Sequence, residues 1–180
     1  GKLKTAVQSE LDERVRAALP PGAKPSEADY DAAGKQLKDR YQADASASRQ
    51  LDTALTRLAD DRYRASPAGQ ADAIIDKARA AGDAPAQVKA LNEGAQKAPP
   101  EVREAVLASP KREQLLQDAA NWAMDPLAGG DATKADEKAR KDFNGAGQQV
   151  PVAKTMERLE LLTRGIDPAL ATALTANTLP

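Results

Sequence analysis

Alanine dominates the apolar part of this sequence, and this feature most limits what the chain can fold into. Of its 74 hydrophobic residues, 39 are Ala, so only 35 apolar side chains are larger than a methyl group. Aromatic residues make up 3 % of the chain, and Leu outnumbers Val plus Ile by 18 to 10. Ala and Leu favour helices, whereas β-sheets are enriched in aromatic and β-branched side chains. The composition therefore predicts an all-α fold with a thin, closely packed core.

Apolar residues recur at helical spacing, and helix-starting residues separate the apolar stretches. Residues 3–19 carry Leu or Val at every fourth position, which is typical of an amphipathic helix. No stretch alternates apolar and polar residues for long enough to be a strand. We therefore expect a compact array of nine or ten short antiparallel helices, arranged as helical hairpins or as an irregular solenoid. Capping residues and prolines predict helix starts at Ser26, Ser66-Pro67, Asp83, Ser109-Pro110 and Asp167-Pro168.

Breaks in this pattern divide the chain into three parts. Residues 1–63 predict an N-terminal helical subdomain, residues 64–128 central helical hairpins, and residues 129–180 a C-terminal hairpin. We expect the three parts to join into one continuous helical domain. Residues 134–142 predict a weakly anchored helix. The predicted buried face of the last long helix consists of Val152, Met156, Leu159 and Leu162.

Two stretches of the sequence align without gaps at an offset of 68 residues. Residues 85–109 and 153–177 each predict a helix, a tight break and a shorter helix opened by proline. The offset is close to twice the period of about 34 residues found in some helix-hairpin repeats, but the tetratricopeptide signature is missing from both stretches. Internal duplication and convergence on a common helix-hairpin pattern therefore both stay open.

The absence of His and Cys excludes several kinds of chemistry. Without them the chain has no Ser-His-Asp or Cys-His catalytic unit, no imidazole or thiolate metal ligand, and no disulfide. The net charge is -1 with both signs interleaved, which argues against a nucleic-acid interface. No apolar run approaches the roughly 18 residues of a membrane-spanning helix. We therefore expect no cofactor, no metal, no nucleic-acid partner and no membrane span.

A pair of carboxylates is the catalytic device that this composition leaves most easily open. In a glycosidase-like mechanism one carboxylic acid protonates the leaving oxygen, and a second carboxylate acts as base or nucleophile. Acidic residues close to Arg in the sequence are more typical of a solvated helix surface. The serines before helix starts are predicted caps, because no base accompanies them. We expect no enzymatic activity, and the carboxylates weighed for it are Glu10, Glu13, Asp60 and Asp61.

Residues 122–127, with the sequence Trp-Ala-Met-Asp-Pro-Leu, allow two interpretations. Trp122 can fill the core beneath the end of a helix. Alternatively, Trp122, Met124 and Leu127 form an exposed anchor for a protein partner, since Trp and Met are enriched where protein surfaces bind. These three residues are the candidate partner-binding residues of the sequence.

Two runs of the chain resemble a family of bacterial proteins. The runs are LDERVRAALPPGAKPSEADYDAAGKQL, residues 11–37, and ALNEGAQKAPPEVREAVLASPKREQLLQDAANWAMDPL, residues 90–127. They are similar to the Ala-rich helical regions of very large secreted effector or toxin-like proteins of Gram-negative bacteria. In those proteins such modules lie between peptidoglycan-binding LysM domains and variable ends. The resemblance implies an exported setting and brings no catalytic residues. The start at Gly1, without Met, favours a segment of a longer protein.

These observations predict a non-catalytic helical scaffold or docking module of a larger, secreted bacterial effector-type protein. One alternative is a small helical enzyme that uses a carboxylate pair on cell-wall glycans. Another is a chaperone or inhibitor module whose groove accepts a partner helix. The enzyme requires a cleft with two facing carboxylates. The binding module requires an apolar surface patch, and a spacer requires neither feature.

Overall fold

The chain folds into helices throughout the part that the structure describes. A computed structural model describes residues 2–42, 44–128 and 150–178. Within these ranges there are nine α-helices and no strand, which confirms the predicted all-α fold. The helix predicted for residues 134–142 lies outside the described residues. By its internal contacts the chain divides into two compact units, Gly1–Ala65 and Ser66–Pro180.

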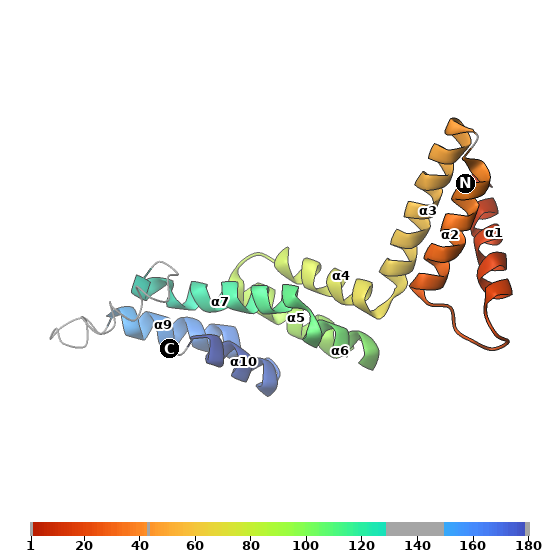
Figure 1. The fold of residues 1–180 in the computed structure, drawn as a ribbon. Coiled ribbons are helices and arrows are strands. Elements are labelled where there is room, and N and C mark those ends of the chain that lie inside the picture. Colours follow the sequence, from red (N-terminus) through yellow and green to blue (C-terminus); the bar gives the residue numbers. More distant parts are fainter. Residues whose placement is uncertain (1, 43, 129–149, 179–180) are drawn as a thin grey trace. The chain divides into compact units, whose positions relative to one another are not determined.

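The first unit is a bundle of three helices, labelled in Figure 1 as α1 (Lys2–Ala18), α2 (Glu27–Tyr41) and α3 (Ala45–Ala65). Each of the three packs against the other two. In α1 the central residues of the predicted apolar stripe are buried, whereas Leu3 at the start of the helix is exposed. The buried core of this unit consists of Val7, Leu11, Val15, Ala33, Leu37, Leu51, Ala54 and Leu58.

Side-chain caps set two helix starts in the first unit. Ser26 precedes α2, and the Asp29 carboxylate accepts hydrogen bonds from the Ser26 N–H (2.7 Å) and the Ser26 hydroxyl (2.6 Å). The Asp44 carboxylate accepts from the N–H groups of Ser46 (2.9 Å) and Ala47 (3.1 Å). The polar stretch 44–48, which lacks an apolar stripe, therefore caps and begins α3.

The second unit holds six described helices, and α7 packs against the other five. Proline is the first residue of four of them, where its missing N–H breaks no hydrogen bond. The Ser66 hydroxyl accepts from the Gly69 N–H (3.1 Å), which confirms the predicted cap. The helices are α4 (Pro67–Arg79), α5 (Ala84–Lys97), α6 (Pro100–Ala108), α7 (Pro110–Ala128), α9 (Val150–Thr163) and α10 (Pro168–Thr178) (Figure 1).

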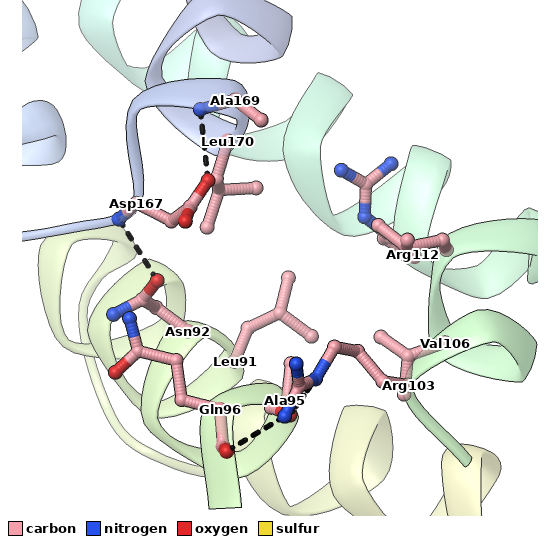
Figure 2. Close-up of a pocket in the computed structure, with 11 residues that line it drawn as sticks. Leu91, Asn92, Ala95, Gln96, Arg103, Val106, Arg112, Asp167, Ala169 and Leu170 are labelled. Atoms are coloured by element: carbon pink, nitrogen blue, oxygen red, sulfur yellow. Dashed lines mark hydrogen bonds between the residues drawn. The ribbon is translucent and has the colours of Figure 1, made fainter. Parts of the chain in front are cut away.

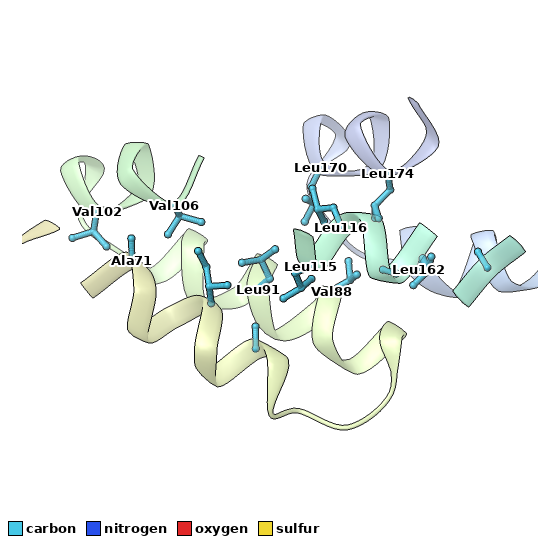
Figure 3. Close-up of a cluster of buried hydrophobic side chains, with 14 residues drawn as sticks. Ala71, Val88, Leu91, Val102, Val106, Leu115, Leu116, Leu162, Leu170 and Leu174 are labelled. Atoms are coloured by element: carbon cyan, nitrogen blue, oxygen red, sulfur yellow. The ribbon is translucent and has the colours of Figure 1, made fainter. Parts of the chain in front are cut away.

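One cluster of buried side chains runs through the second unit. Figure 3 shows Val102 of α6 towards one end of it and Leu174 of α10 towards the other. Four of its fourteen residues are Ala, and these small side chains let the helices pack close together. The two helices α4 and α5 approach closely at Gly94 of α5, where an added Cβ would lie only 2.7 Å from Cγ2 of Ile74 on α4.

The buried face of α9 differs from the prediction. Leu162 is 1 % exposed and Leu159 is half-buried, as expected, but Val152 and Met156 are 47 % and 62 % exposed. Thr155 takes the buried place instead, with 8 % exposure. The side of α9 that meets the core is therefore rotated from the large apolar residues towards a small polar one, because packing against neighbouring helices outweighs the local pattern.

The two aligned stretches agree fully in one half only. Val102 and Val106 of α6 are buried, and so are the residues 68 positions later, Leu170 and Leu174 of α10. In the preceding helices, Val88 is fully buried, whereas its counterpart Met156 is exposed. The α6 and α10 helices therefore bury matching positions, whereas α5 and α9 match only in part, with Leu91 and its counterpart Leu159 both packed in or against the core.

Candidate functional site

A pocket of about 410 Å³ opens in the second unit where α5, α6, α7 and the start of α10 meet (Figure 2). A volume of this size lies within the range of about 300–1,000 Å³ that is usual for ligand sites. The lining is predominantly apolar. It consists of Leu91, Asn92, Ala95, Gln96, Arg103, Val106, Leu107, Arg112, Asp167, Ala169 and Leu170.

The apolar walls of this pocket belong to the core of the unit. Leu91, Val106 and Leu170 are buried members of the main cluster, and Figure 2 shows Leu91 in the middle of the lining residues. Leu107 also lines the pocket, but it is 56 % exposed. The helical phase that buries Val106 turns Leu107 outward, so an apolar residue stands between the pocket and solvent.

Arg103 fixes the turn between α5 and α6. Its guanidinium donates to the carbonyls of Ala95 (3.2 Å), Gln96 (3.1 Å) and Ala98 (3.3 Å). These carbonyls lie at the end of α5, where helix carbonyls lack partners within the helix and the helix dipole is negative. Arg103 therefore acts as a C-terminal cap and forms one wall of the pocket.

Asn92 and Asp167 tie α5 to the start of α10. Asn92 is only 6 % exposed, and its side-chain oxygen accepts from the Asp167 N–H at 3.0 Å. The Asp167 carboxylate in turn accepts from the Ala169 N–H at 2.8 Å, in the first turn of α10. Both polar groups therefore hold the backbone in place, and Asp167 is the only carboxylate among the lining residues.

Arg112 of α7 is the charged side chain of the pocket that holds nothing else in place. Within residues 2–42, 44–128 and 150–178, its guanidinium makes no hydrogen bond and has no carboxylate within 4.0 Å. Burial lowers the pKa of this half-buried guanidinium, and the nearby Glu113 carboxylate opposes the shift. An arginine stays charged at neutral pH even so. Arg112 therefore gives the pocket a positive charge to which no carboxylate of the described residues is bonded.

The candidate partner-binding residues lie elsewhere on α7, outside the lining of this pocket. Trp122 is half-buried and packs against the main cluster. Arg158 of α9 lies over its ring, 4.7 Å from the ring centroid, and donates to the Trp122 carbonyl at 2.6 Å. Met124 is half-buried, and the side chain of Leu127 lies outside the described part. A partner-binding role for these three residues stays a prediction.

The four carboxylates weighed for catalysis lie in the first unit and not in the pocket. Glu10 faces Arg40 at 3.6 Å, and Asp61 pairs with Lys4. The hydrogen bond from Lys4 lowers the Asp61 pKa, whereas a general acid at neutral pH requires a raised one. Glu13 and Asp60 are exposed. The structure does not bring the four together in a shared site.

The described residues contain neither a cluster of metal ligands nor a membrane-spanning helix. They contain no group of three acidic side chains placed to hold a metal ion. None of the helices in the described ranges is both long enough and apolar enough to cross a membrane.

Sequence reasoning missed the pocket because its lining comes from four separate helices. The one local signal is Leu107, a large apolar residue that follows Val102, Ala105 and Val106 but does not share the helix face on which their spacing places them. Whether Arg112 forms an ion pair cannot be predicted from the sequence, since it depends on which carboxylates the fold brings near.

Comparison with known proteins gives no relative: no family model, curated protein or solved structure matches the chain. The resemblance to Ala-rich regions of secreted effectors therefore stays a prediction, and the function has to be argued from the chain's own residues.

Proposed function

We propose that this chain is a non-catalytic helical docking module, and that the pocket of the second unit receives an apolar side chain of a protein partner. The module would belong to a larger, exported bacterial protein of the effector type. One observation carries the docking function: an apolar pocket of about 410 Å³ whose lining includes a large exposed apolar residue, Leu107.

The lining resembles the centre of a protein interface in composition. Interface centres are rich in apolar side chains and Arg, and poor in other charged residues. Leucine and valine form most of the apolar wall, and the charged residues are two arginines and one aspartate. Burying the apolar surface of Leu107 would contribute a favourable free energy of about 25 cal/mol per Å² to binding. The proposed contact therefore has both an apolar cavity to fill and an apolar residue to cover.

Enzymatic use of the pocket finds less support in its residues. A glycosidase-like reaction needs two carboxylates about 5–9 Å apart. Asp167 is the single carboxylate of the lining, and it accepts a hydrogen bond from the Ala169 N–H. The exported setting has a separate basis, namely the composition and the resemblance of residues 11–37 and 90–127.

Selection of peptides tests the docking function. A displayed library of random peptides is selected on the whole chain, and the binders are measured again on a variant with a blocked pocket, Ala169→Trp. Ala169 is exposed and lines the pocket, so the large ring obstructs the pocket without entering the core. The matched control is Ala73→Trp on α4, another exposed alanine, which lies outside the lining.

We expect selected peptides that keep their affinity for Ala73→Trp and lose at least tenfold on Ala169→Trp. Their amide chemical-shift changes should fall on α5, α6, α7 and α10. Peptides that bind both variants equally, with shifts elsewhere, would refute docking at this pocket. Hydrolysis of cell-wall glycan by the chain, abolished in Asp61→Asn, would favour the enzyme instead.

A further inference from the structure

We propose that the pocket selects an aliphatic side chain with a carboxylate beside it, and that Arg112 is the residue that binds this carboxylate. The inference rests on the proposed docking function and adds the chemistry of the partner. It starts from the charged groups of the lining, which are Arg103, Arg112 and Asp167.

Two of these three charged groups are already engaged. Arg103 donates to three carbonyls at the end of α5, so its hydrogen-bonding edge is turned towards its own backbone. The Asp167 carboxylate accepts from the Ala169 N–H at the start of α10. Figure 2 draws the contact of Arg103 with Gln96 and that of Asp167 with Ala169 as dashed lines, and shows Arg112 on α7 among the lining residues. Arg112 alone among the three has a guanidinium without a partner in the described chain.

The neighbouring cations on this side of the unit show that partners are the rule here. Lys111, the residue before Arg112, pairs with Asp72 (2.9 Å) and faces Asp76 (3.6 Å) on α4. Arg79 of α4 faces Asp118 of α7 at 3.7 Å. The α4 carboxylates thus neutralise the adjacent Lys111, whereas Arg112 points to a different side of α7 and receives none.

The position of Arg112 suits a ligand that has both an apolar and an anionic part. Besides the pocket, Arg112 lines a second hollow between α7 and α10, together with Leu116 and Ala173. Its guanidinium therefore lies between the mainly apolar pocket and a more polar hollow, whose lining also includes Glu113, Gln114 and Gln117. A planar guanidinium can bind a carboxylate through two parallel hydrogen bonds, and partial burial strengthens such a contact. A side chain such as Leu would fill the cavity beside Leu91, and the carboxylate would compensate Arg112.

We assign this carboxylate to the C-terminus of the partner, because a C-terminal Leu carries the aliphatic side chain and the carboxylate on one residue, and Leu91 and Arg112 belong to one lining. An internal acidic residue would offer the same chemistry to Arg112, and two pairs of probes separate the two sources. Acetyl-leucine and acetyl-leucinamide differ only in the carboxylate at the chain end. Acetyl-Leu-Glu-amide and acetyl-Leu-Gln-amide differ only in an internal carboxylate. Each of the four is titrated into the whole chain at millimolar concentration, and binding is followed by amide chemical shifts.

We expect acetyl-leucine to bind at least tenfold more tightly than acetyl-leucinamide, and the preference to weaken with added salt. Arg112→Gln should remove the preference and leave the weak binding of the amide unchanged. Arg112→Lys should restore part of it, because Lys keeps the charge but not the planar fork. The matched control is Arg164→Gln, an exposed arginine at the end of α9 that does not line the pocket and should change nothing.

Two failures can be told apart. If acetyl-leucine binds no better than its amide, or if Arg112→Gln keeps the preference, recognition of a C-terminal carboxylate is refuted, whatever the displayed peptides do. A preference confined to acetyl-Leu-Glu-amide would likewise refute the C-terminal source. If selected peptides still depend on an unobstructed pocket in that case, the docking function stands without this refinement. If those peptides ignore the Ala169→Trp block, the docking function itself is refuted.

Discussion

Replacing Gly94 of α5 by alanine should destabilise the second unit, although alanine is the better helix former. A Cβ added at Gly94 would lie 2.7 Å from Cγ2 of Ile74, 3.7 Å from its Cβ and 3.8 Å from its Cγ1. Carbon atoms in good contact are about 3.5–4.0 Å apart. Because Cγ2 is bonded directly to Cβ of a β-branched residue, it cannot move away without a change of rotamer or a shift of the backbone.

The net effect is the difference between two opposing terms. Alanine in place of glycine stabilises a helix interior by roughly 0.5–1 kcal/mol. Forcing one methyl group into a filled contact costs about 1–3 kcal/mol. We therefore expect Gly94→Ala to lower the free energy of unfolding by about 1 kcal/mol.

Gly34 of α2 provides the matched comparison. A Cβ there would lie 3.7 and 3.8 Å from the two methyl groups of Leu55, which is ordinary van der Waals contact. Only the helix-propensity term remains, so Gly34→Ala should raise the free energy of unfolding by roughly 0.5–1 kcal/mol. The same substitution thus has opposite signs at two glycines inside helices.

Urea unfolding can follow the two units separately. Trp122 is the only Trp of the chain and lies in the second unit, whereas Tyr30, Tyr41 and Tyr63 all lie in the first. Trp emission therefore reports Gly94→Ala, and tyrosine absorbance reports Gly34→Ala.

A double-mutant cycle decides whether the contact with Ile74 is the cause. In an Ile74→Ala background the obstructing methyl group is gone, so Gly94→Ala should become stabilising. If Gly94→Ala stabilises the wild-type chain, or destabilises both backgrounds equally, the reasoning from the close approach is refuted.

Three further predictions concern single polar groups. Thr155→Val should raise the free energy of unfolding by about 1 kcal/mol, and with it the urea midpoint of the Trp122 signal, because the buried Thr155 hydroxyl has no hydrogen-bond partner among the described residues; a lower midpoint would contradict this. The Asp29 pKa is lowered by hydrogen bonds from Ser26, so its stabilising effect is present above the unfolded pKa of 3.8 and lost as the pH falls through the lower folded value. Asp29→Asn should therefore reduce the loss of tyrosine-reported stability in acid, and parallel pH curves for the two proteins would argue against it. Arg158→Met should lower the stability of the second unit by about 1–2 kcal/mol and shift Trp122 emission, since it removes a charged hydrogen bond and the ring contact; an unchanged spectrum and midpoint would count against it.

Local signals predicted the helix starts because the responsible contacts are local. A cap such as Ser66 binds an N–H three residues away, and a proline such as Pro100 or Pro168 fixes its own backbone angle. The same holds for the overall class, since Ala and Leu favour helices in any surroundings.

Properties that depend on distant parts of the chain could not be predicted in this way. The sequence stripe of α9 pointed to Val152 and Met156, but the neighbouring helices bury Thr155. The pocket likewise combines residues from 91 to 170 along the chain. The free guanidinium of Arg112 became visible only with the positions of the surrounding carboxylates.

The capping of α5 by Arg103 has a kinetic consequence. Because three carbonyls are held by one guanidinium, the corner between α5 and α6 is in place before any partner arrives. A binding partner would therefore meet a preformed pocket wall, and binding would not require the loop to rearrange. The observed association rate should then grow in proportion to partner concentration without reaching a plateau, as in encounters between rigid bodies.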